Sequence, residues 1–237
     1  MRLDQSQIHN SLLRTMGTND FYLLSNWLEA IDLPRRFVLS RSNRPSDHTY
    51  FLESGIASVV VDAGNGMAAE VCLVGREGVV PVTGVLGPMS SPFEAFMQVG
   101  GQGFRIATIH LLAACEASLS LRALLNRYVQ ATLVQTSFTA FSNATHQIEQ
   151  RLARWILMCH DRTQGDNIEL THEFLSVMLA IRRQSVTTTL HSLEGKRLII
   201  SSRGSVTVRD RKGLEELAGS AYGVPEREYQ DLIRPPT

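Results

Sequence analysis

Hydrophobic residues change their spacing along the chain and divide it into four stretches. In residues 4–32 they recur every three or four positions, which predicts two short helices. Between residues 36 and 108 they form short runs rich in β-branched side chains, separated by turn residues. From 110 to 162 the spacing is helical again, and the polar turn 163–167 precedes a last stretch of mixed character. The pattern predicts a β-rich unit followed by helices.

The β-rich stretch contains several runs with the length and composition of strands. They occupy residues 37–39, 50–52, 57–62, 68–74, 94–99 and 103–107. Turns such as Glu53-Ser54-Gly55 and Gly100-Gly101 separate them. Short strands with turns at this spacing are typical of a sandwich or a barrel.

The helical stretch 110–162 is too long for one ordinary helix. Its spacing predicts a short helix at about 110–116, a long one at about 118–144 and a third at about 145–162. An apolar stripe on a long helix in mid-chain is typical either of the spine of one core or of a dimer seam. The seam residues would be Leu121, Leu124, Tyr128, Leu133 and Phe138.

Length and composition are those of a globular protein. The chain has 237 residues, enough for one large domain or two modest ones. With 43% hydrophobic and 19% charged residues it has neither a disordered nor a fibrous composition. It lacks a secretory signal and any apolar run of about 18 residues, so we expect a cytoplasmic protein without a membrane partner.

The cysteines Cys72, Cys115 and Cys159 are far apart and odd in number, which favours neither a disulfide framework nor a metal site. We expect them to be buried small hydrophobic residues. Nothing near Cys115 or Cys159 in the sequence would clearly lower a thiol pKa, as an oxidation switch requires.

Charge is distributed unevenly, although the chain holds 23 basic and 23 acidic residues. Residues 168–212 hold eight basic and four acidic side chains, a net charge of +4, and the rest of the chain is −4. The basic residues are Arg182, Arg183, Lys196, Arg197, Arg203, Arg209, Arg211 and Lys212. The asymmetry favours two domains with different partners and keeps nucleic acid among the candidates.

Two short amphipathic helices joined by a tight turn are predicted within this basic stretch. Thr171 has the position of an N-cap for the first, which runs from 172 to 180. Val186, Leu190 and Leu193 have the spacing of the buried face of the second. Its polar face holds Arg182, Arg183, Gln184, Thr187, Thr188 and His191. This arrangement is typical of a helix-turn-helix.

The residue types at the start of the second helix suit contacts with DNA. Arg can donate two hydrogen bonds to guanine, Gln can pair with adenine, and Thr can reach phosphate or a thymine methyl group. The helix dipole disfavours two arginines at an N-terminus, so their presence argues for a partner. Residues 198–208 predict a β-hairpin with Arg203-Gly204 at its tip, a wing that would lay Arg203 along a phosphate backbone.

The stretch LTHEFLSVMLAIRRQSVTTTLHSLEGKRLIISSRGSVTVRD resembles the winged helix-turn-helix of the catabolite activator and fumarate-nitrate regulator (Crp/Fnr) family of bacterial transcription regulators. Arg183, Gln184 and Thr188 fall where this family reads bases through an Arg-Glu-x-x-x-Arg pattern. Only Arg183 is kept, so the resemblance does not imply the family's usual half-site.

The order of the units upstream is also similar to that of the Crp/Fnr family, and the resemblance implies an α+β fold. Residues 1–117 correspond to a cyclic-nucleotide-binding-like β-roll with N-terminal helices, and 118–144 to a central dimerisation helix. Residues 145–218 correspond to the winged helix-turn-helix DNA-binding domain. A polar C-terminal tail, 219–237, follows, and we expect it to be partly loose.

The sensor site of the family is altered in this sequence. Members that bind cyclic AMP place a Glu on the ribose and an Arg-Ser pair on the phosphate. Glu77 and Gly78 occupy the corresponding loop, but residues 77–104 contain no Arg or Lys, and Phe93-Glu94-Ala95 replaces the expected Arg-Ser-Ala. A partly buried phosphate needs a cation, and Glu94 would repel it. We predict a degenerate effector pocket at Glu77, Gly78 and Glu94 that does not bind cyclic AMP; the effector is unknown.

Other chemistries have less support. The family's iron-sulfur members use several cysteines near the N-terminus, whereas the first cysteine here is Cys72. A haem ligand among the seven histidines stays open, but we predict no cofactor. No Gly-x-Ser-x-Gly or His-Glu-x-x-His pattern organises a catalytic site, so we expect a protein that is not an enzyme.

The sequence therefore predicts a sequence-specific regulator that binds double-stranded DNA. A homodimer is expected because one recognition helix reads few base pairs, whereas a two-fold dimer places two on successive major grooves. RNA polymerase is a further candidate partner. The alternative is an effector-binding or scaffold protein of the same fold that has lost specific DNA binding.

Overall fold

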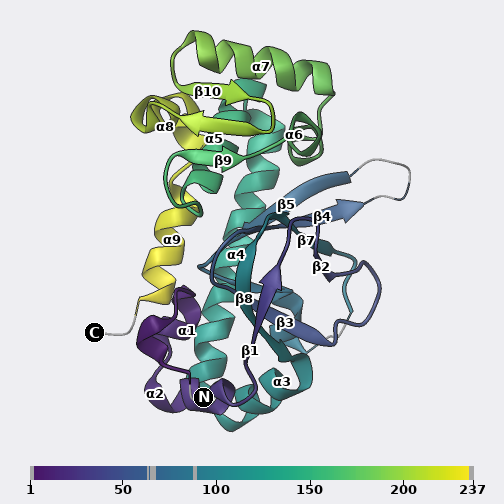
Figure 1. The fold of residues 1–237 in the computed structure, drawn as a ribbon, viewed down its shortest axis with the longest axis vertical. Coiled ribbons are helices and arrows are strands. Elements are labelled where there is room, and N and C mark those ends of the chain that lie inside the picture. Colours follow the sequence, from purple (N-terminus) through teal and green to yellow (C-terminus); the bar gives the residue numbers. More distant parts are fainter. Residues whose placement is uncertain (1–2, 63, 65–67, 88–89, 235–237) are drawn as a thin grey trace.

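Two antiparallel four-stranded sheets form the N-terminal half of the computed structural model (Figure 1). The first has the order β1 (Glu29–Leu33), β8 (Gly101–Ala107), β3 (His48–Leu52) and β6 (Val79–Val80). The second has the order β2 (Val38–Ser40), β7 (Glu94–Val99), β4 (Ile56–Asp62) and β5 (Ala68–Val74). Inward-facing side chains of both sheets, among them Leu33, Leu52, Val74 and Met97, share one core. The structure describes residues 3–62, 64, 68–87 and 90–234.

All of the predicted strands are present, and β1 and β6 are additional. The sequence predicted a helix that reaches residue 32, because Leu28 and Ile31 are three residues apart, like residues on one face of a helix. This prediction is wrong at the C-terminal end, since the helix ends at Ser25. Pairing of Glu29 with Arg105 and of the following residues with β8 makes this segment a strand instead. β6 is only two residues long, and pairing with β3 defines it.

Short helices close one end of the β-roll. They are η1 (Gln5–Gln7), α1 (Ser11–Thr15), α2 (Thr18–Ser25) and α3 (Thr108–Ala117). Leu12, Phe21 and Leu24 are fully buried and share a core with Leu111 and Leu121. The N-terminal helices therefore anchor the start of the long helix.

The long helix α4 (Leu119–Thr145) runs along the β-roll and continues into the C-terminal half (Figure 1). Ser118 caps it, because its hydroxyl accepts the Leu121 N–H at 3.2 Å. After α4 the chain is extended, and α5 (Ile148–His160) follows with the Gln150 side chain accepting the Gln147 N–H at 3.1 Å. The three predicted helices are thus confirmed, and their ends differ from prediction by at most three residues.

The C-terminal half contains a helix-turn-helix and a small sheet. Its elements are β9 (Asn167–Glu169), α6 (His172–Leu179), α7 (Arg183–Gly195), β10 (Ile199–Ser202), β11 (Ser205–Val208) and α8 (Arg211–Ala218). The sheet has the order β10, β11, β9. The predicted helix pair and the hairpin of the wing are confirmed as structural elements, and β9 adds a third strand.

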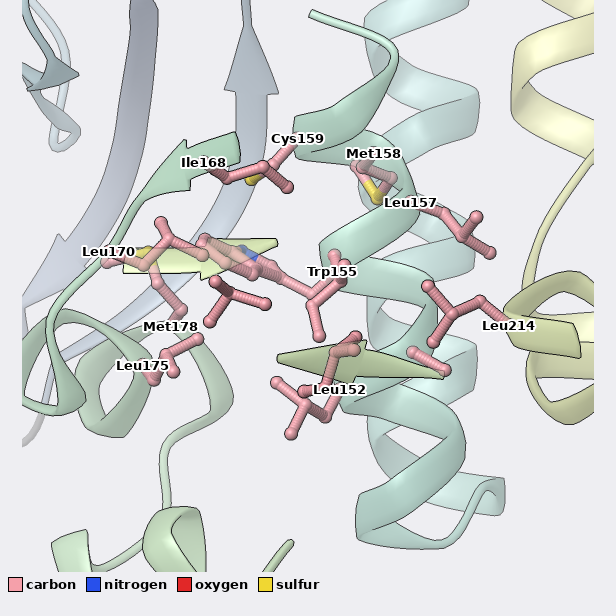
Figure 2. Packing of buried hydrophobic residues seen from close by; sticks show 14 of the residues in the cluster. Leu152, Trp155, Leu157, Met158, Cys159, Ile168, Leu170, Leu175, Met178 and Leu214 are labelled. Carbon is pink, nitrogen blue, oxygen red and sulfur yellow. The ribbon is translucent and has the colours of Figure 1, made fainter. Parts of the chain in front are cut away.

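Buried residues of α5 organise the core of this half (Figure 2). Leu152 and Trp155 project from α5 toward α6 and the small sheet, where Leu175 and Met178 complete the cluster. Ile56 and other residues of β4 and β5 belong to the same cluster. The two halves are therefore packed through a shared apolar core rather than connected by a linker alone.

The C-terminal segment is a helix where the sequence predicted a partly loose tail. After η3 (Gly219–Ala221), the helix α9 (Val224–Ile233) lies against α4 (Figure 1). Ile233 is buried in the N-terminal core, and Arg127 Nε–H donates to Leu232 O at 2.8 Å. Pro225, Tyr229 and Ile233 recur every four residues and supply the packed face, so the expectation of a loose tail is wrong for this helix.

Among the described residues, no single helix is long and apolar enough to cross a membrane. In the described part of the chain, α3 and α4 together have the length and apolar composition of a span, and they are bent by 119° relative to each other.

Candidate nucleic-acid interface and effector pocket

α7 lies at the opposite end of the molecule from α1 and α2 (Figure 1). Val186, Leu190 and Leu193 are buried against α5 and α6, as their spacing predicts. Burial of this stripe turns the other side of α7, including its N-terminal residues, toward solvent.

The turn between α6 and α7 is held by specific hydrogen bonds. The hydroxyl of Thr171 caps α6 by accepting the Phe174 N–H at 3.3 Å, as predicted. Ala180 adopts a left-handed conformation with φ of +51°, which is uncommon for alanine. The Ile181 N–H donates to Ser176 O at 3.1 Å, and Ser176 Oγ donates back to Ile181 O at 2.8 Å. These bonds fix the angle at which α7 leaves the turn.

The structure brings the predicted polar residues of α7 together on one exposed side. Arg182, Arg183, Gln184 and His191 are exposed, and no described residue forms an ion pair with either arginine. Arg182 occupies the N-cap position without a side-chain capping bond, so the N-cap side chain does not satisfy the first backbone N–H groups of α7. Uncapped amides and two guanidinium groups that form no ion pair with a described residue make a surface that suits phosphate and base edges.

The two threonines of this surface differ in exposure. Thr188 is exposed and Thr187 is half-buried. Thr187 Oγ1 donates to Arg183 O at 3.2 Å, and Thr188 Oγ1 donates to Gln184 O at 3.1 Å. Because these protons are engaged inside the helix, both side chains are better suited to contact a thymine methyl group than to donate to phosphate.

The hairpin of β10 and β11 has Arg203 and Gly204 at its tip. Gly204 has a φ of +84°, a conformation that glycine adopts without strain. Arg203 is exposed and forms no ion pair with any described residue. A cation at this position is available to an external anion.

Not all of the basic residues in 168–212 are available to bind a partner. Arg211 pairs with Asp161 at 2.7 Å and with Glu215 at 2.9 Å, and it also bonds the Tyr222 hydroxyl. Lys196 forms an ion pair with Glu149. These two cations stabilise contacts within the chain, so the positive charge open to a partner is smaller than the sequence count.

The predicted effector residues do not share one cavity. Glu77 forms an ion pair with Arg162, whose Nε lies 2.6 Å from Glu77 Oε1, in a hollow beside α4 and α9. Glu94 lines a different hollow, next to Arg36 and Phe174. The prediction of one pocket between Glu77 and Glu94 is therefore wrong. Alternation along the strand turns Glu94 to the opposite side from Phe93 and Ala95.

Gly78 serves packing in this structure. A Cβ atom at this position would collide with the hydroxyl of Tyr128 on α4. The glycine is required for this close approach of the β5–β6 turn to the long helix, which is a different role from the predicted contact with an effector.

A separate cavity of about 110 Å3 lies inside the β-roll, next to α4. Phe93 and Ala95, the neighbours of Glu94, line it together with Ser40 on β2 and Thr132 and Thr136 on α4. The described residues around it include no charged side chain. The sequence correctly identified a segment without a cation, but its expected acidic repulsion is absent because Glu94 lies outside the cavity.

The predicted dimer seam is split between two environments. Leu121, Leu124 and Tyr128 are buried in the chain's own core, so their assignment to a seam is wrong. Leu133 is 65% exposed, and Phe138 is half-buried. The exposed apolar positions lie further along α4 and include Phe141.

A buried carboxyl group joins the two halves at their shared core. Trp155 Nε1–H donates to Glu70 Oε1 at 2.7 Å, and the Ser58 hydroxyl also donates to Glu70. Arg154 is buried nearby and donates to Thr139 Oγ1 at 3.1 Å. Burial raises the pKa of Glu70 to about 8, although the two hydrogen bonds favour the charged form. The sequence held no signal for this contact, because its partners are 85 positions apart.

The raised pKa of Glu70 predicts that stability falls with rising pH. The folded state holds this proton more tightly than the unfolded chain, whose carboxyl has a pKa near 4.5. The stabilisation is complete below about pH 4.5 and lost by about pH 8, with a slope of up to about 1.4 kcal/mol per pH unit. Chemical denaturation between pH 5 and 8 should show this slope in the wild type and a flatter profile in Glu70→Gln. The exposed Glu216→Gln is the control, and equal slopes in all three proteins would contradict the prediction.

The three cysteines are buried, as predicted. Burial raises the pKa of the Cys115 thiol to about 11 and that of Cys72 to about 12, and it also raises the pKa of the Cys159 thiol well above its ordinary value. Neutral, buried thiols react slowly with oxidants, so the structure does not favour an oxidation switch at these positions.

Residues 150–217 match the family of the Crp-like helix-turn-helix domain. A comparison with curated proteins gives no match. The matched segment contains α6, α7 and the hairpin, which are the elements that carry the exposed arginines.

Solved structures of Crp/Fnr regulators resemble the chain over most of its length. FixK2 from Bradyrhizobium japonicum is 13% identical with a TM-score of 0.71, and the match covers 81% of this chain and 98% of FixK2. TTHA1359, a Crp/Fnr regulator from Thermus thermophilus, is 20% identical with a TM-score of 0.63, covering 80% and 98%. The c-di-GMP-responsive regulator CLP from Xanthomonas campestris is 15% identical with a TM-score of 0.64, covering 81% and 99%.

The chain therefore carries a Crp-like helix-turn-helix domain, and it has the fold of the Crp/Fnr transcription regulators. The predicted α+β class, with an N-terminal β-roll, a long central helix and a C-terminal winged helix-turn-helix, is confirmed.

Proposed function

We propose that the protein is a dimeric, sequence-specific DNA-binding transcription regulator in the cytoplasm, and not an enzyme. The observation that carries the proposal is the exposed N-terminal end of α7, where Arg182, Arg183 and Gln184 stand without acidic partners among the described residues. Arg203 on the hairpin supplies a second cation for the phosphate backbone.

Selection from a random pool of DNA duplexes tests this function. The wild type should enrich a defined sequence within a few rounds, because bidentate Arg and Gln contacts discriminate between base pairs. A protein of this fold that has lost specific DNA binding would enrich none, and this result would favour an effector-binding or scaffold role. RNA polymerase is a proposed partner of the complex with DNA, in keeping with a regulator of transcription.

The proposed dimer uses the part of α4 that the chain leaves exposed. Leu133 and Phe141 are large apolar side chains that are more than half exposed on this helix. A two-fold dimer through this stripe would give two recognition helices, one for each half-site. The proposed division of labour places the sensor in 1–117, the dimer helix in 118–144 and DNA binding in 145–218.

Leu133→Glu should weaken the dimer by at least about 30-fold, because it removes an apolar contact and buries a charge. Sedimentation velocity at micromolar concentration measures the change. Ile109→Glu replaces another exposed apolar residue, on α3, and should leave the dimer intact. A wild type that is monomeric with and without DNA would contradict the dimer.

We further propose that cyclic AMP is not the effector. The described residues that line the β-roll cavity supply no cation for a cyclic phosphate, and Glu77 is already paired with Arg162. Isothermal titration should detect no binding of cyclic AMP at micromolar concentration. Micromolar affinity would refute this part of the proposal.

A further inference from the structure

We propose that the β-roll cavity binds a small, neutral, largely apolar molecule that carries one hydrogen-bonding group. The walls come from β2, β4, β5, β6, β7 and α4. Aliphatic side chains dominate them, including Val59, Val71, Val74, Val79 and Val80. A cavity with apolar walls is a poor site for water, which needs several polar partners, and it favours an apolar occupant.

The partner of the occupant's hydrogen-bonding group is the hydroxyl of Ser40. Its hydroxyl is buried on β2 and has no hydrogen-bond partner in the described part of the chain. A buried hydroxyl without a partner is destabilising, so a ligand group that bonds it gains both affinity and orientation. By contrast, the Thr132 hydroxyl on the opposite wall already donates to Tyr128 O at 3.0 Å.

The size of the cavity limits the occupant to about one ring. Its volume of about 110 Å3 is somewhat smaller than the roughly 150 Å3 of an engineered apolar cavity that binds benzene. A cyclic nucleotide is larger and charged. The cavity therefore selects against a cyclic nucleotide by volume as well as by charge.

Two walls connect the cavity to the proposed DNA-binding machinery. Thr132 and Thr136 belong to α4, the proposed dimer helix. Phe93, just before β7, and Ala95, on β7, line the cavity, and the ring of Phe96 on the same strand lies 6.1 Å from the ring of Phe174 on α6. This coupling rests on the proposed function, whereas ligand binding itself does not.

The test uses phenol and benzene, which differ only in one hydroxyl group, with the full-length protein. Saturation-transfer NMR should show saturable binding of both compounds, and phenol should bind more tightly than benzene. Ser40→Ala should weaken the binding of phenol by about two- to tenfold and leave the binding of benzene unchanged. This variant removes an unpartnered polar group, so it should fold. Val71→Phe, at a half-buried position of β5, should reduce the binding of both by filling the cavity.

The proposal is overturned if neither compound binds saturably. It is also overturned if phenol binds with the same affinity to wild type, Ser40→Ala and Val71→Phe, because the compound then binds elsewhere. Anisotropy with the selected duplex, with and without phenol, separates the two claims. Phenol binding without DNA binding supports the cavity and contradicts the proposed function, and DNA binding without phenol binding contradicts the cavity alone.

Discussion

Arg183→Ala is expected to weaken binding of the selected DNA duplex by about 1–3 kcal/mol and to relax specificity at one base pair of each half-site. Arg183 is the first residue of α7, is exposed and has no ion pair with a described residue. Its guanidinium group can donate two parallel bonds to guanine, and alanine offers none. Fluorescence anisotropy at a fixed salt concentration measures the loss.

Two further variants make this result specific. Arg203→Ala should weaken the binding of all duplexes by a similar factor and reduce the salt dependence of binding. The reason is that a residue of the hairpin that contacts phosphate does not distinguish base pairs. Arg227→Ala removes the same charge from an exposed position on α9, away from α7 (Figure 1), and should change little. Equal affinity of Arg183→Ala, Arg203→Ala and wild type would refute the assigned surface.

Trp155→Ala is expected to lower the free energy of unfolding by about 3–5 kcal/mol, the usual cost of truncating a buried tryptophan. Trp155 is 3% exposed in the core shared by both halves (Figure 2). The substitution also leaves the Glu70 carboxyl without its indole donor. Chemical denaturation at neutral pH measures the change.

The second tryptophan supplies the control. Trp27 is 50% exposed and stacks on His110, with ring centroids 3.7 Å apart, so Trp27→Ala should cost much less. If the two variants lost the same stability, the shared core would not have the importance that its burial indicates. Trp155→Phe keeps an aromatic ring, so its free energy of unfolding should lie between those of the wild type and Trp155→Ala.

Elements with a strong local pattern could be predicted from the sequence. Helix α7 is the best example, because Val186, Leu190 and Leu193 define its buried side and therefore also its exposed one. The hairpin followed from alternating β-branched residues around Arg203-Gly204. In these cases neighbours in sequence decide the structure.

Long-range contacts could not be predicted in this way. Pairing with β8 converts Glu29–Leu33 into a strand, although its local spacing is helical. The polar composition of 219–237 obscured the packed side of α9. An apolar stripe does not reveal its partner, so Leu121 and Leu124 were placed in a dimer seam although they lie in the chain's own core.

The sensor pocket was the least predictable part for the same reason. The absence of a cation from 77–104 could be read directly from the sequence. The direction of Glu94 depends on the orientation of β7 in its sheet, and the partner of Glu77 is Arg162, 85 positions away. The side chains that line the cavity therefore emerged only from the fold.

Competition between the selected duplex and a scrambled duplex of the same composition tests the central claim most directly. At one fixed, near-physiological salt concentration, we predict that the wild type prefers the selected duplex by about a thousandfold or more. An affinity ratio near one would contradict the assignment of the protein as a sequence-specific DNA-binding regulator.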